Sequence, residues 1–364
     1  MDNILCTNCH HPYPERGASY RCPTCGGLFD YAVFPSFNPN QIDASQPGIW
    51  RYRSTLGLTE GAPTVSLGEG RTPLVWAETH HRRVAFKLEF LNPSGSFKDR
   101  GSALLVSFLA SRKVKTAIED SSGNAGASFA AYAARAGIQA RVFVPESAAG
   151  PKRFQIEAYG AEVVSVPGPR SNAAQAVIQA AEKGAAYASH AYLPFNLPGY
   201  ATVAYEIFEQ IGQAPGTVVL PAGQGGFLLG AYRGFAGLKR AGLIQWMPRL
   251  VGVQARSCAP LWALSSYGPN GLSWVTEAST LAEGVRVLHP LRGDAVLNAV
   301  EASGGFFLAI DEQDILPGRN QLARLGFYVE PTSALVWAAL DQAIDQMIDP
   351  VVVLLTGSGL KYSA

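Results

Sequence analysis

One lysine, Lys98, lies in a stretch of small and polar residues, NPSGSFKDRG, at residues 92–101. The apolar run VAFKLEFL precedes this stretch and the Ala- and Leu-rich run SALLVSFLASRK follows it, which predicts a junction between a strand and a helix. Most lysines lie on solvated faces, because burying an unpaired ammonium group is costly. Beside glycines and hydroxyl groups at such a junction, Lys98 is a candidate nucleophile, since a desolvated site lowers the pKa of a lysine.

A second polar stretch, EDSSGNAGAS, follows another strand-like run. Ser121, Ser122, Gly123 and Asn124 precede a helix that we expect to begin near Ala125. Asn or Ser at such a position is a good helix N-cap. Capping alone would explain this motif, so by itself it does not indicate a binding site.

A third stretch, VVLPAGQGGFLLGA, is rich in glycine. Gly223, Gln224, Gly225 and Gly226 lie between a predicted strand and a predicted helix. Glycines let a phosphate approach backbone N–H groups, and a helix N-terminus adds partial positive charge. The stretch is neither a Walker A motif nor a complete GxGxxG fingerprint, and a glycine-rich turn is its simpler interpretation.

The fourth stretch, VVVLLTGSGLK, lies near the C-terminal end of the sequence. An apolar strand-like run ends in Thr356, Gly357, Ser358 and Gly359. A hydroxyl group at this position could form a hydrogen bond with a ring nitrogen of a ligand. A plain glycine-rich turn is the alternative.

Short apolar runs alternate with helical ones from Val84 onward. We expect buried strands at residues 84–91, 115–121, 140–145, 161–167, 217–223, 249–255 and 351–357. Between them, helical spacing of apolar residues predicts helices at residues 124–137, 150–160, 172–184, 201–212 and 226–242, each ending in glycine. This alternation predicts an α/β fold with mostly parallel sheets, where ligands bind beyond the carboxyl ends of the strands. Residues 265–310 lack a regular pattern and have no assignment.

Composition and charge favour a globular protein that acts on a small molecule. The 364 residues suggest two or three domains, and 48 % hydrophobic with 16 % charged residues is enough for a large core. With 29 basic and 28 acidic side chains, the chain has no basic field to attract nucleic acid or an anionic membrane. The N-terminus lacks the features of a signal peptide and no apolar run is long enough to span a bilayer, so we expect a cytoplasmic protein.

Four of the five cysteines form two CxxC pairs, Cys6 with Cys9 and Cys22 with Cys25. Paired CxxC motifs bring four thiolates together for tetrahedral zinc, and Gly26 and Gly27 permit the tight turn after the second pair. A disulfide-bonded or vestigial pair is less favoured, because a cytosolic compartment keeps thiols reduced. His10 and His11 could replace a ligand, but two CxxC pairs make this unnecessary. We interpret Cys258 as an ordinary buried residue.

Taken together, the four stretches resemble one known family. PSGSFKDRG, SSGNAGASFAAYAARAG, PAGQGGF and LTGSGLK occur in this order behind paired CxxC motifs. They resemble the threonine synthase family, which belongs to fold type II, the β-family, of pyridoxal-phosphate (PLP) enzymes. The resemblance implies a two-domain α/β fold with open, mostly parallel sheets and an N-terminal zinc-ribbon-like extension, and a homodimer is the usual expectation for this fold.

The resemblance also implies domain boundaries. Residues 1–30 would form the zinc-ribbon-like extension. Residues 31–90 together with 190–364 would form a large PLP-binding domain. Residues 91–189 would form a small mobile α/β domain that carries the lysine and asparagine loops.

The resemblance assigns a role to each motif. It implies that Lys98 forms a Schiff base with the cofactor aldehyde and later moves protons as a general acid and base. It implies that Asn124 bonds to the phenolic oxygen and that Thr356 faces the pyridine nitrogen. The amides of the glycine stretch, at Gly223, Gln224, Gly225 and Gly226, would bind the phosphate. A neutral hydroxyl at the ring nitrogen favours elimination or replacement over transamination.

Substrate contacts are expected from four more residues, Ser94, Ser121, Ser122 and Glu283. Glu283 and Gly284 lie in STLAEGVRV, which reads like the TxADG stretch of threonine and serine dehydratases. Phe227 stands where the threonine synthase family often has Asn. Asn196 and Ala201 lie near positions where that family often has Arg and Lys.

Those differences leave the substrate open. Arg286, Arg292, Lys152 and Arg153 are candidates for a replacement anion clamp, and a surface position is the simpler expectation for each. For Asp99 and Arg100 we likewise expect a mutual ion pair at the surface.

Three functions follow. The first is a carbon–oxygen lyase reaction, the γ-elimination and hydration that converts O-phosphohomoserine to threonine and phosphate. The second is β-elimination or β-replacement on another amino acid, as in a threonine or serine dehydratase. The third is a catalytically silent scaffold, which the intact Lys98, Asn124 and glycine loop disfavour.

Overall fold

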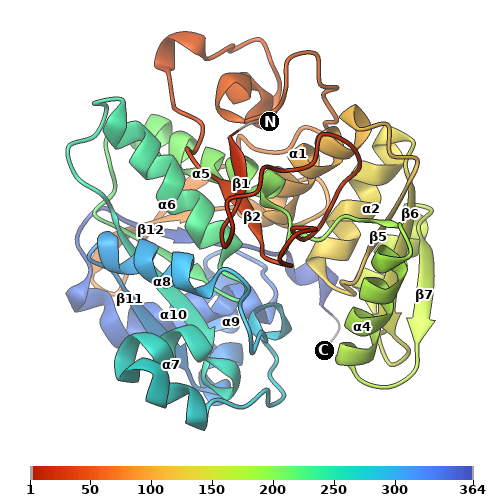
Figure 1. Cartoon of the computed structure of the whole chain (residues 1–364). Helices are drawn as coiled ribbons and strands as arrows, with labels where there is room; N and C mark the ends of the chain where they lie inside the picture. The colour runs from red at the N-terminus through yellow and green to blue at the C-terminus, as the bar shows by residue number, and fades with distance from the viewer. Residues whose placement is uncertain (1–2, 363–364) are drawn as a thin grey trace. The chain divides into compact units, whose positions relative to one another are not determined.

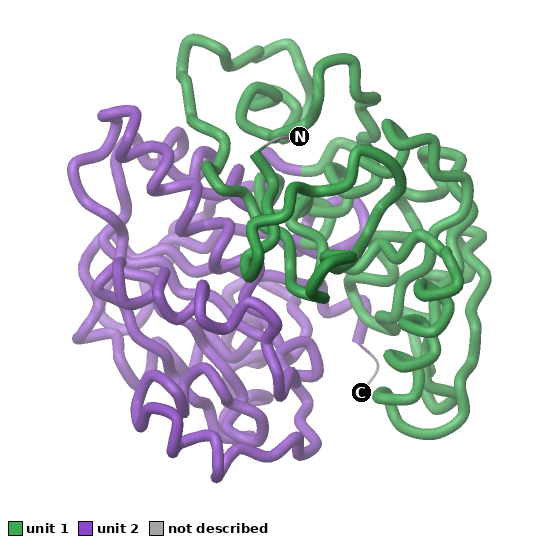
Figure 2. The backbone as a smooth tube through the Cα atoms, viewed as in Figure 1, with its two compact units in different colours: residues 1–69, 98–199, 363 green, residues 70–97, 200–362, 364 purple. Residues whose placement is uncertain are grey.

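The computed structural model describes residues 3–362 of the chain, which form two compact units (Figure 2). Among the described residues, unit 1 comprises residues 3–69 and 98–199, and unit 2 comprises residues 70–97 and 200–362. The chain therefore passes from unit 2 into unit 1 at the peptide bond between Phe97 and Lys98. The domain boundaries expected from the resemblance stay a prediction.

Unit 1 is built on a four-stranded parallel sheet in the order β7-β6-β5-β8. Its strands are β5 Thr116–Glu119, β6 Gln139–Pro145, β7 Glu162–Val166 and β8 Ala186–Tyr187. Its helices, which Figure 1 labels in part, are α1 Lys98–Ser111, α2 Asn124–Ala136, α3 Pro151–Ala158 and α4 Arg170–Glu182. Parallel strands need crossover connections, and helices supply them here. Helix α1 is buried at every position from Asp99 to Leu109, which makes it a core helix.

A small antiparallel hairpin, β1 Ile4–Cys6 with β2 Phe29–Tyr31, carries the cysteine pairs. Tyr13 and Phe29 from this region join Phe108 of α1 and Phe195 in one aromatic cluster. Tyr13 meets Phe29 edge-to-face at 4.7 Å between ring centroids, and it meets Phe195 at 5.1 Å. Phe108 stacks on Phe195 at 3.6 Å. The cysteine hairpin is thus packed against the helix that begins at Lys98.

Unit 2 is built on a six-stranded sheet in the order β11-β10-β9-β12-β4-β3. Its strands are β3 Leu74–Thr79, β4 Arg82–Lys87, β9 Thr217–Pro221, β10 Arg249–Ala255, β11 Phe306–Ile310 and β12 Val351–Leu354. All neighbours are parallel except β3, which pairs antiparallel with β4 at one edge. The helices are α5 Leu197–Ile211, α6 Gly226–Arg240, α7 Pro260–Tyr267, α8 Gly293–Ala302, α9 Glu312–Arg324 and α10 Pro331–Ala343.

Helices cover both faces of this sheet. Val251 and Val253 of β10 lie in the apolar cluster that contains Leu335 of α10. Gly252, between them, points to the opposite face, because side chains alternate along a strand. A Cβ atom at Gly252 would lie 3.1 Å from Leu228 of α6. The sheet is therefore wrapped by helices on two sides, as apolar parallel strands require.

The structure confirms the predicted α/β class, and strands and helices occur where the alternation predicted them. The unassigned region, residues 265–310, contains α8, β11 and short 3₁₀ turns such as Glu283–Val285. The sequence reasoning did not predict α9 or α10. Within the described residues, no helix combines the length and apolar character needed to span a membrane.

A buried ion pair joins β4 to α5 in unit 2. Lys87 and Glu206 have 0 % and 1 % exposed side chains, and Lys87 Nζ lies 2.7 Å from Glu206 Oε2. The same ammonium donates to Thr72 O at 2.7 Å and to Gln210 Oε1 at 2.9 Å. Glu206 Oε1 accepts the backbone N–H of Arg71 at 2.8 Å. Because both charges are paired and hydrogen-bonded, this lysine is buried for structural reasons.

We predict that Lys87→Met lowers the free energy of unfolding by about 3–5 kcal/mol, because it leaves the Glu206 carboxylate buried without its cation. Urea-induced unfolding measures the effect. The double variant Lys87→Met/Glu206→Gln is the control, since its side-chain amide carries no charge but keeps an acceptor for the Arg71 N–H. It should recover most of the loss, and a single variant as stable as the wild type would contradict the prediction.

Candidate functional site

Lys98 is the first residue of α1, and the two charged residues after it are fully buried. Asp99 and Arg100 have 0 % exposed surface, so the expectation of a surface ion pair is wrong. Asp99 accepts a hydrogen bond from Ser128 Oγ of α2 at 2.5 Å, and Ser128 Oγ also lies 2.8 Å from Ser102 Oγ. These contacts hold the first turn of α1 against α2 and thereby fix the backbone at Lys98.

The motif at Ser121–Asn124 connects β5 to α2. Gly123 is the N-cap of α2 with no side-chain cap, and Asn124 is already the first helical residue. The expected capping role for Asn or Ser at this helix start is therefore wrong. Ser121 Oγ instead accepts the backbone N–H of Gly123 at 3.2 Å. A Cβ atom at Gly126 would lie 1.8 Å from Ser121 O, so only glycine lets the helix begin this close to the strand.

Unit 1 also brings together titratable groups that the sequence reasoning missed. Glu119, the last residue of β5, lies with its Oε1 2.7 Å from His190 Nδ1. Burial raises the pKa of Glu119 and lowers the pKa of His190, and the positive charge of Lys98 lowers both. The position of Glu119 at the carboxyl end of a predicted strand was the one available signal. His190 follows β8, a strand of two residues that no pattern indicated.

In unit 2, the segment before Lys98 is hydrogen-bonded to the segment after β12. Phe97 donates its N–H to Thr356 O at 3.0 Å, and Ser358 donates to Gly95 O at 3.0 Å. Lys361 Nζ donates to Ser94 O at 2.8 Å. The first and fourth motifs, far apart in the sequence, are therefore neighbours.

The glycine stretch follows β9 and leads into α6. Gly225 has φ +75°, and a Cβ atom there would lie 2.5 Å from Val296. A Cβ atom at Gly223 would lie 2.7 Å from Gly284 O, so the stretch containing Glu283 passes directly beside this loop. Among described residues, the amides of Gly223, Gln224 and Gly225 have no acceptor. Unpaired amides at the N-terminus of a 15-residue helix could bind an anion.

Aromatic rings connect the glycine stretch to the lysine segment. Phe227, in the first turn of α6, stacks on Phe97 with ring centroids 4.3 Å apart. Tyr200 meets Phe97 at 5.5 Å and Phe227 at 5.7 Å. Phe227 is thus a packing residue, and its stack holds the loop near the residue that precedes Lys98.

A serine that the sequence reasoning missed determines how the Thr356 hydroxyl is oriented. Ser333 Oγ accepts the backbone N–H groups of Thr356 at 2.6 Å and Gly357 at 2.9 Å. Those two bonds use both lone pairs of Ser333, so its own proton is donated to Thr356 Oγ1, 2.8 Å away. The Thr356 hydroxyl is left to donate its proton elsewhere. Ser333 had no sequence signal beyond its place at the start of a helix.

Two of the four basic residues considered for an anion clamp are bonded to acceptors in their own neighbourhood. Arg153 Nε lies 3.0 Å from Glu157 Oε1, and its Nη1 donates to Ala148 O. Arg286 Nη2 donates to the backbone carbonyl oxygen of Glu277 at 3.0 Å, and Arg286 Nε lies 4.0 Å from Oε1 of the Glu277 side chain. These contacts support the surface interpretation for Arg153 and Arg286. Arg292 is buried, so the surface expectation is wrong for that residue.

The four clustered cysteines, Cys6, Cys9, Cys22 and Cys25, form a compact group with all sulfurs within 4.8 Å of one another. Three sulfur pairs lie 3.4, 3.5 and 3.6 Å apart. A tetrahedron with Zn–S bonds of about 2.3 Å has edges of about 3.8 Å, so the group is near the size that zinc needs. His10 and Gly26 occupy equivalent turns after the two pairs, with φ +58° and +73°. Neither His10 nor His11 belongs to the group.

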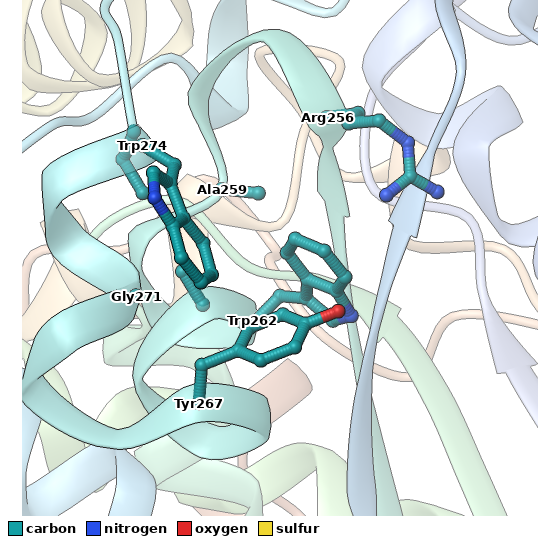
Figure 3. A pocket seen from close by; sticks show the side chains of 8 residues that line it. Arg256, Ala259, Trp262, Tyr267, Gly271 and Trp274 are labelled. Carbon is teal, nitrogen blue, oxygen red and sulfur yellow. The ribbon is translucent and has the colours of Figure 1, made fainter.

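An aromatic pocket of about 470 Å³ lies elsewhere in unit 2 (Figure 3). It is lined by Arg256, Ala259, Trp262, Ala263, Tyr267, Gly271, Trp274 and Val275. Arg256 is already paired with Asp311 at 2.6 Å and lies over the Trp262 ring. None of the residues predicted from the motifs lines this pocket, so it is distinct from the predicted site.

Comparison with known proteins identifies the family. A model of the family described as pyridoxal-phosphate dependent enzymes matches residues 65–357. Threonine synthase of Methanocaldococcus jannaschii is 31 % identical over 373 residues, covering 98 % of this chain and 92 % of its own. Threonine synthase of Synechocystis sp. is 34 % identical over 344 residues, which cover 90 % of this chain and 88 % of the Synechocystis protein.

A solved structure agrees with this result. A threonine deaminase from the organism abbreviated T.th. superimposes with a TM-score of 0.68 at 27 % identity, covering 81 % of this chain and 94 % of its own. The fold type expected from the resemblance is therefore confirmed. This chain belongs to the threonine synthase family of pyridoxal-phosphate-dependent enzymes and is a carbon–oxygen lyase of that type.

Proposed function

We propose that this protein converts O-phosphohomoserine to threonine and phosphate. The observation that carries the proposal is its similarity to proteins named threonine synthase along nearly the whole chain. No geometric feature of the described residues favours β-elimination on threonine or serine over this reaction. A catalytically silent scaffold is disfavoured because the lysine, the glycine loop and the Thr356 hydroxyl are all present and held by neighbours.

The residues present fit PLP. The unpaired amides of Gly223, Gln224 and Gly225 match a phosphate, because three N–H donors at a helix N-terminus stabilise an anion. The Thr356 hydroxyl, which Ser333 leaves to donate, matches the lone pair of an unprotonated ring nitrogen. The primary amine of Lys98 matches an aldehyde.

We assign the motif residues accordingly. Lys98 binds the aldehyde, Asn124 bonds to the phenolic oxygen and Thr356 to the ring nitrogen. Gly226 completes the phosphate loop as the first residue of α6. When bound, PLP supplies an electron sink for the substrate carbon. Lys98 then takes a proton from that carbon and returns it as a general base and acid.

Substrate contacts are assigned to Ser94, Ser121, Ser122 and Glu283. Ser121 and Ser122 support this role through their place at the carboxyl end of β5. Glu283 supports it through the packing of Gly284 against the glycine loop, where Gly284 N–H donates to Thr332 Oγ1 at 3.0 Å.

We further propose that the cysteine group binds a structural zinc ion and that the chain forms a homodimer, as the fold family leads us to expect. The size of the sulfur group supports zinc. Zinc thiolates need reduced cysteines, which suits the cytoplasm. Light scattering tests the dimer by giving twice the mass of one chain.

The function is tested with full-length protein supplied with PLP. O-phosphohomoserine should yield phosphate and threonine in equal amounts. The protein should show a visible absorption band that borohydride removes. Lys98→Ala should lose the band and reduce turnover by about 10²–10⁴-fold or more, because it removes both the covalent attachment and the proton carrier. Lys113→Ala, at an exposed position in the same unit, is the matched control and should retain both.

Two results would overturn this proposal. Release of 2-oxobutyrate from threonine without phosphate turnover would identify a dehydratase. A protein that stays colourless with added PLP would refute the cofactor assignment.

We predict that Ser333→Ala weakens PLP binding about tenfold, the equivalent of roughly 1.4 kcal/mol, because the Thr356 hydroxyl loses its fixed orientation. The free energy of unfolding should also fall by about 1–3 kcal/mol, since two buried amides lose their acceptor. Equilibrium dialysis and urea unfolding measure these effects. In the described part of the chain, the nearby Ser358 hydroxyl bonds to the Leu360 amide alone, so Ser358→Ala should bind PLP normally. Unchanged PLP affinity in Ser333→Ala would refute the role of Ser333.

We predict that Cys22→Ser abolishes zinc binding and destabilises unit 1, because the hairpin packs on α1 through Tyr13 and Phe108. Elemental analysis should give one zinc per wild-type chain, and thermal unfolding should begin at lower temperature in the variant. Cys258→Ser, a buried cysteine outside the group, should keep its zinc. A wild-type protein that stays zinc-free when zinc is supplied would contradict the prediction.

A further inference from the structure

A histidine and a glutamate meet at the carboxyl edge of the unit 1 sheet. β5 and β8 are parallel neighbours, with Ile118 opposite Tyr187. Ala188 then donates its N–H to Ile118 O at 2.8 Å, which extends the pairing past the end of β8. Glu119 ends β5 and His190 follows this extension of β8. The sheet therefore places them together at the edge where parallel sheets bind ligands.

The hydrogen bond between them joins one carboxylate oxygen of Glu119 to one ring nitrogen of His190. Glu119 is 1 % exposed, and its Oε1 lies 2.7 Å from His190 Nδ1. Its Oε2 accepts the backbone N–H of Asp120, so both oxygens face donors. Burial raises the pKa of Glu119, and the bonds from Asp120 and the charge of Lys98 oppose only part of this rise. A carboxylate can only accept hydrogen bonds, so an ionised Glu119 accepts from Nδ1–H and holds the imidazole proton on Nδ1.

The other ring nitrogen, Nε2, has its lone pair available. Within residues 3–362 it has no hydrogen-bond partner, and the His190 side chain is 19 % exposed. The backbone that carries the ring is held in place, because Asn196 Nδ2 donates to His190 O at 2.6 Å. The result is an oriented imidazole that presents one proton acceptor to solvent or substrate.

The charges around the ring keep it neutral. Burial lowers the pKa of His190 well below its usual value, and the charges of Lys98 and Arg170 lower it further while Asp120 opposes them. Asp120 is bonded to Tyr187 Oη at 2.7 Å. Burial, with a smaller effect of the Glu119 charge, raises the pKa of Asp120 to about 6. At neutral pH the ring is therefore a base and not an imidazolium ion.

We propose that His190, oriented by Glu119, is a second acid–base group beside Lys98 and accepts the proton of the water that adds to the substrate. The water oxygen bonds to the substrate carbon while the carbon–carbon double bond left by the loss of phosphate opens, and its electron pair is later protonated at the neighbouring carbon by Lys98. The O–H bond of the water breaks as its proton moves to Nε2, and the Glu119 carboxylate stabilises the resulting imidazolium. His190 then releases this proton to solvent and returns to its neutral form, so the step consumes one water and leaves the enzyme unchanged. Glu119 is the positioning residue, since it acts through the imidazole.

This inference rests on the proposed function, and its first test does not. Nitrogen NMR of full-length protein labelled at histidine nitrogens reports which ring nitrogen carries the proton. His190→Gln identifies the signal by its absence. We expect the Nδ1–H form in the wild type and a mixture in Glu119→Gln. An Nε2–H form in the wild type would overturn the inference whether or not the enzyme makes threonine.

The second test measures how the reaction divides between products. Without a base, water adds slowly to the intermediate that has lost phosphate. This intermediate should then be released and hydrolysed to 2-oxobutyrate, so less of it becomes threonine. His190→Gln should therefore release phosphate while its ratio of threonine to 2-oxobutyrate falls by about 10²-fold. Added imidazole should partly restore the ratio in His190→Ala. Tyr187→Phe, which removes only the hydroxyl bonded to Asp120, should keep the wild-type ratio.

Each outcome of these tests supports or overturns the role of His190. A wild-type ratio in folded His190→Gln overturns the catalytic role of His190 while leaving the proposed function intact. A wild-type protein that makes no threonine overturns the proposed function, and with it this role. If His190→Gln does not fold, two other measurements replace it. His190→Ala assigns the NMR signal, and the ratio of threonine to 2-oxobutyrate is measured in Glu119→Gln, where we also expect it to fall.

Discussion

The hydrogen bonds at the end of β12 are the constraint on which the rest of unit 2 depends. β12 is an interior, fully buried strand, and hydrogen bonds to β9 on one side and to β4 on the other fix its register. Thr356 follows this strand. Its carbonyl oxygen accepts the backbone N–H of Phe97, and its hydroxyl is hydrogen-bonded to the hydroxyl of Ser333. The strand thus positions both a hydroxyl group and the residue that precedes Lys98. A site built on a rigid strand end holds its groups more precisely than one built on a free loop.

The chain contains two notable lysines, and only the structure separates them. Lys87 is fully buried and its three donors reach Glu206, Gln210 and a carbonyl oxygen, so its ammonium is saturated. Lys98 begins a helix beside Glu119 and His190, groups that themselves titrate. Burial alone therefore does not identify a reactive lysine.

Sequence patterns predicted those features that depend on near neighbours in the chain. Apolar runs revealed the buried parallel strands, and the CxxC spacing predicted the clustered sulfurs, because both follow from local geometry. Asp99 and Arg100 were misjudged because charge suggests exposure, whereas α1 is a core helix. The sequence patterns did not predict the role of Ser333 in orienting the Thr356 hydroxyl, because this role depends on a strand end 23 residues away. The role of His190 likewise depends on a partner 71 residues away in the sequence.

Ser333 and Glu119 act by the same physical device in the two units. Each is a buried group that fixes where a neighbour's proton lies. Ser333 donates its hydroxyl hydrogen bond to Thr356 Oγ1, which leaves the threonine hydroxyl to donate elsewhere. In the proposed arrangement Glu119 accepts a hydrogen bond from His190 Nδ1–H, which leaves Nε2 to accept a proton. A hydroxyl or imidazole alone could do either. The chain therefore specifies direction as well as position: unit 2 presents a donor, suited to a ring nitrogen, and unit 1 presents an acceptor, suited to water. Because that assignment follows from saturated hydrogen bonds of buried partners, changing one partner should invert a proton's location without moving the functional group itself.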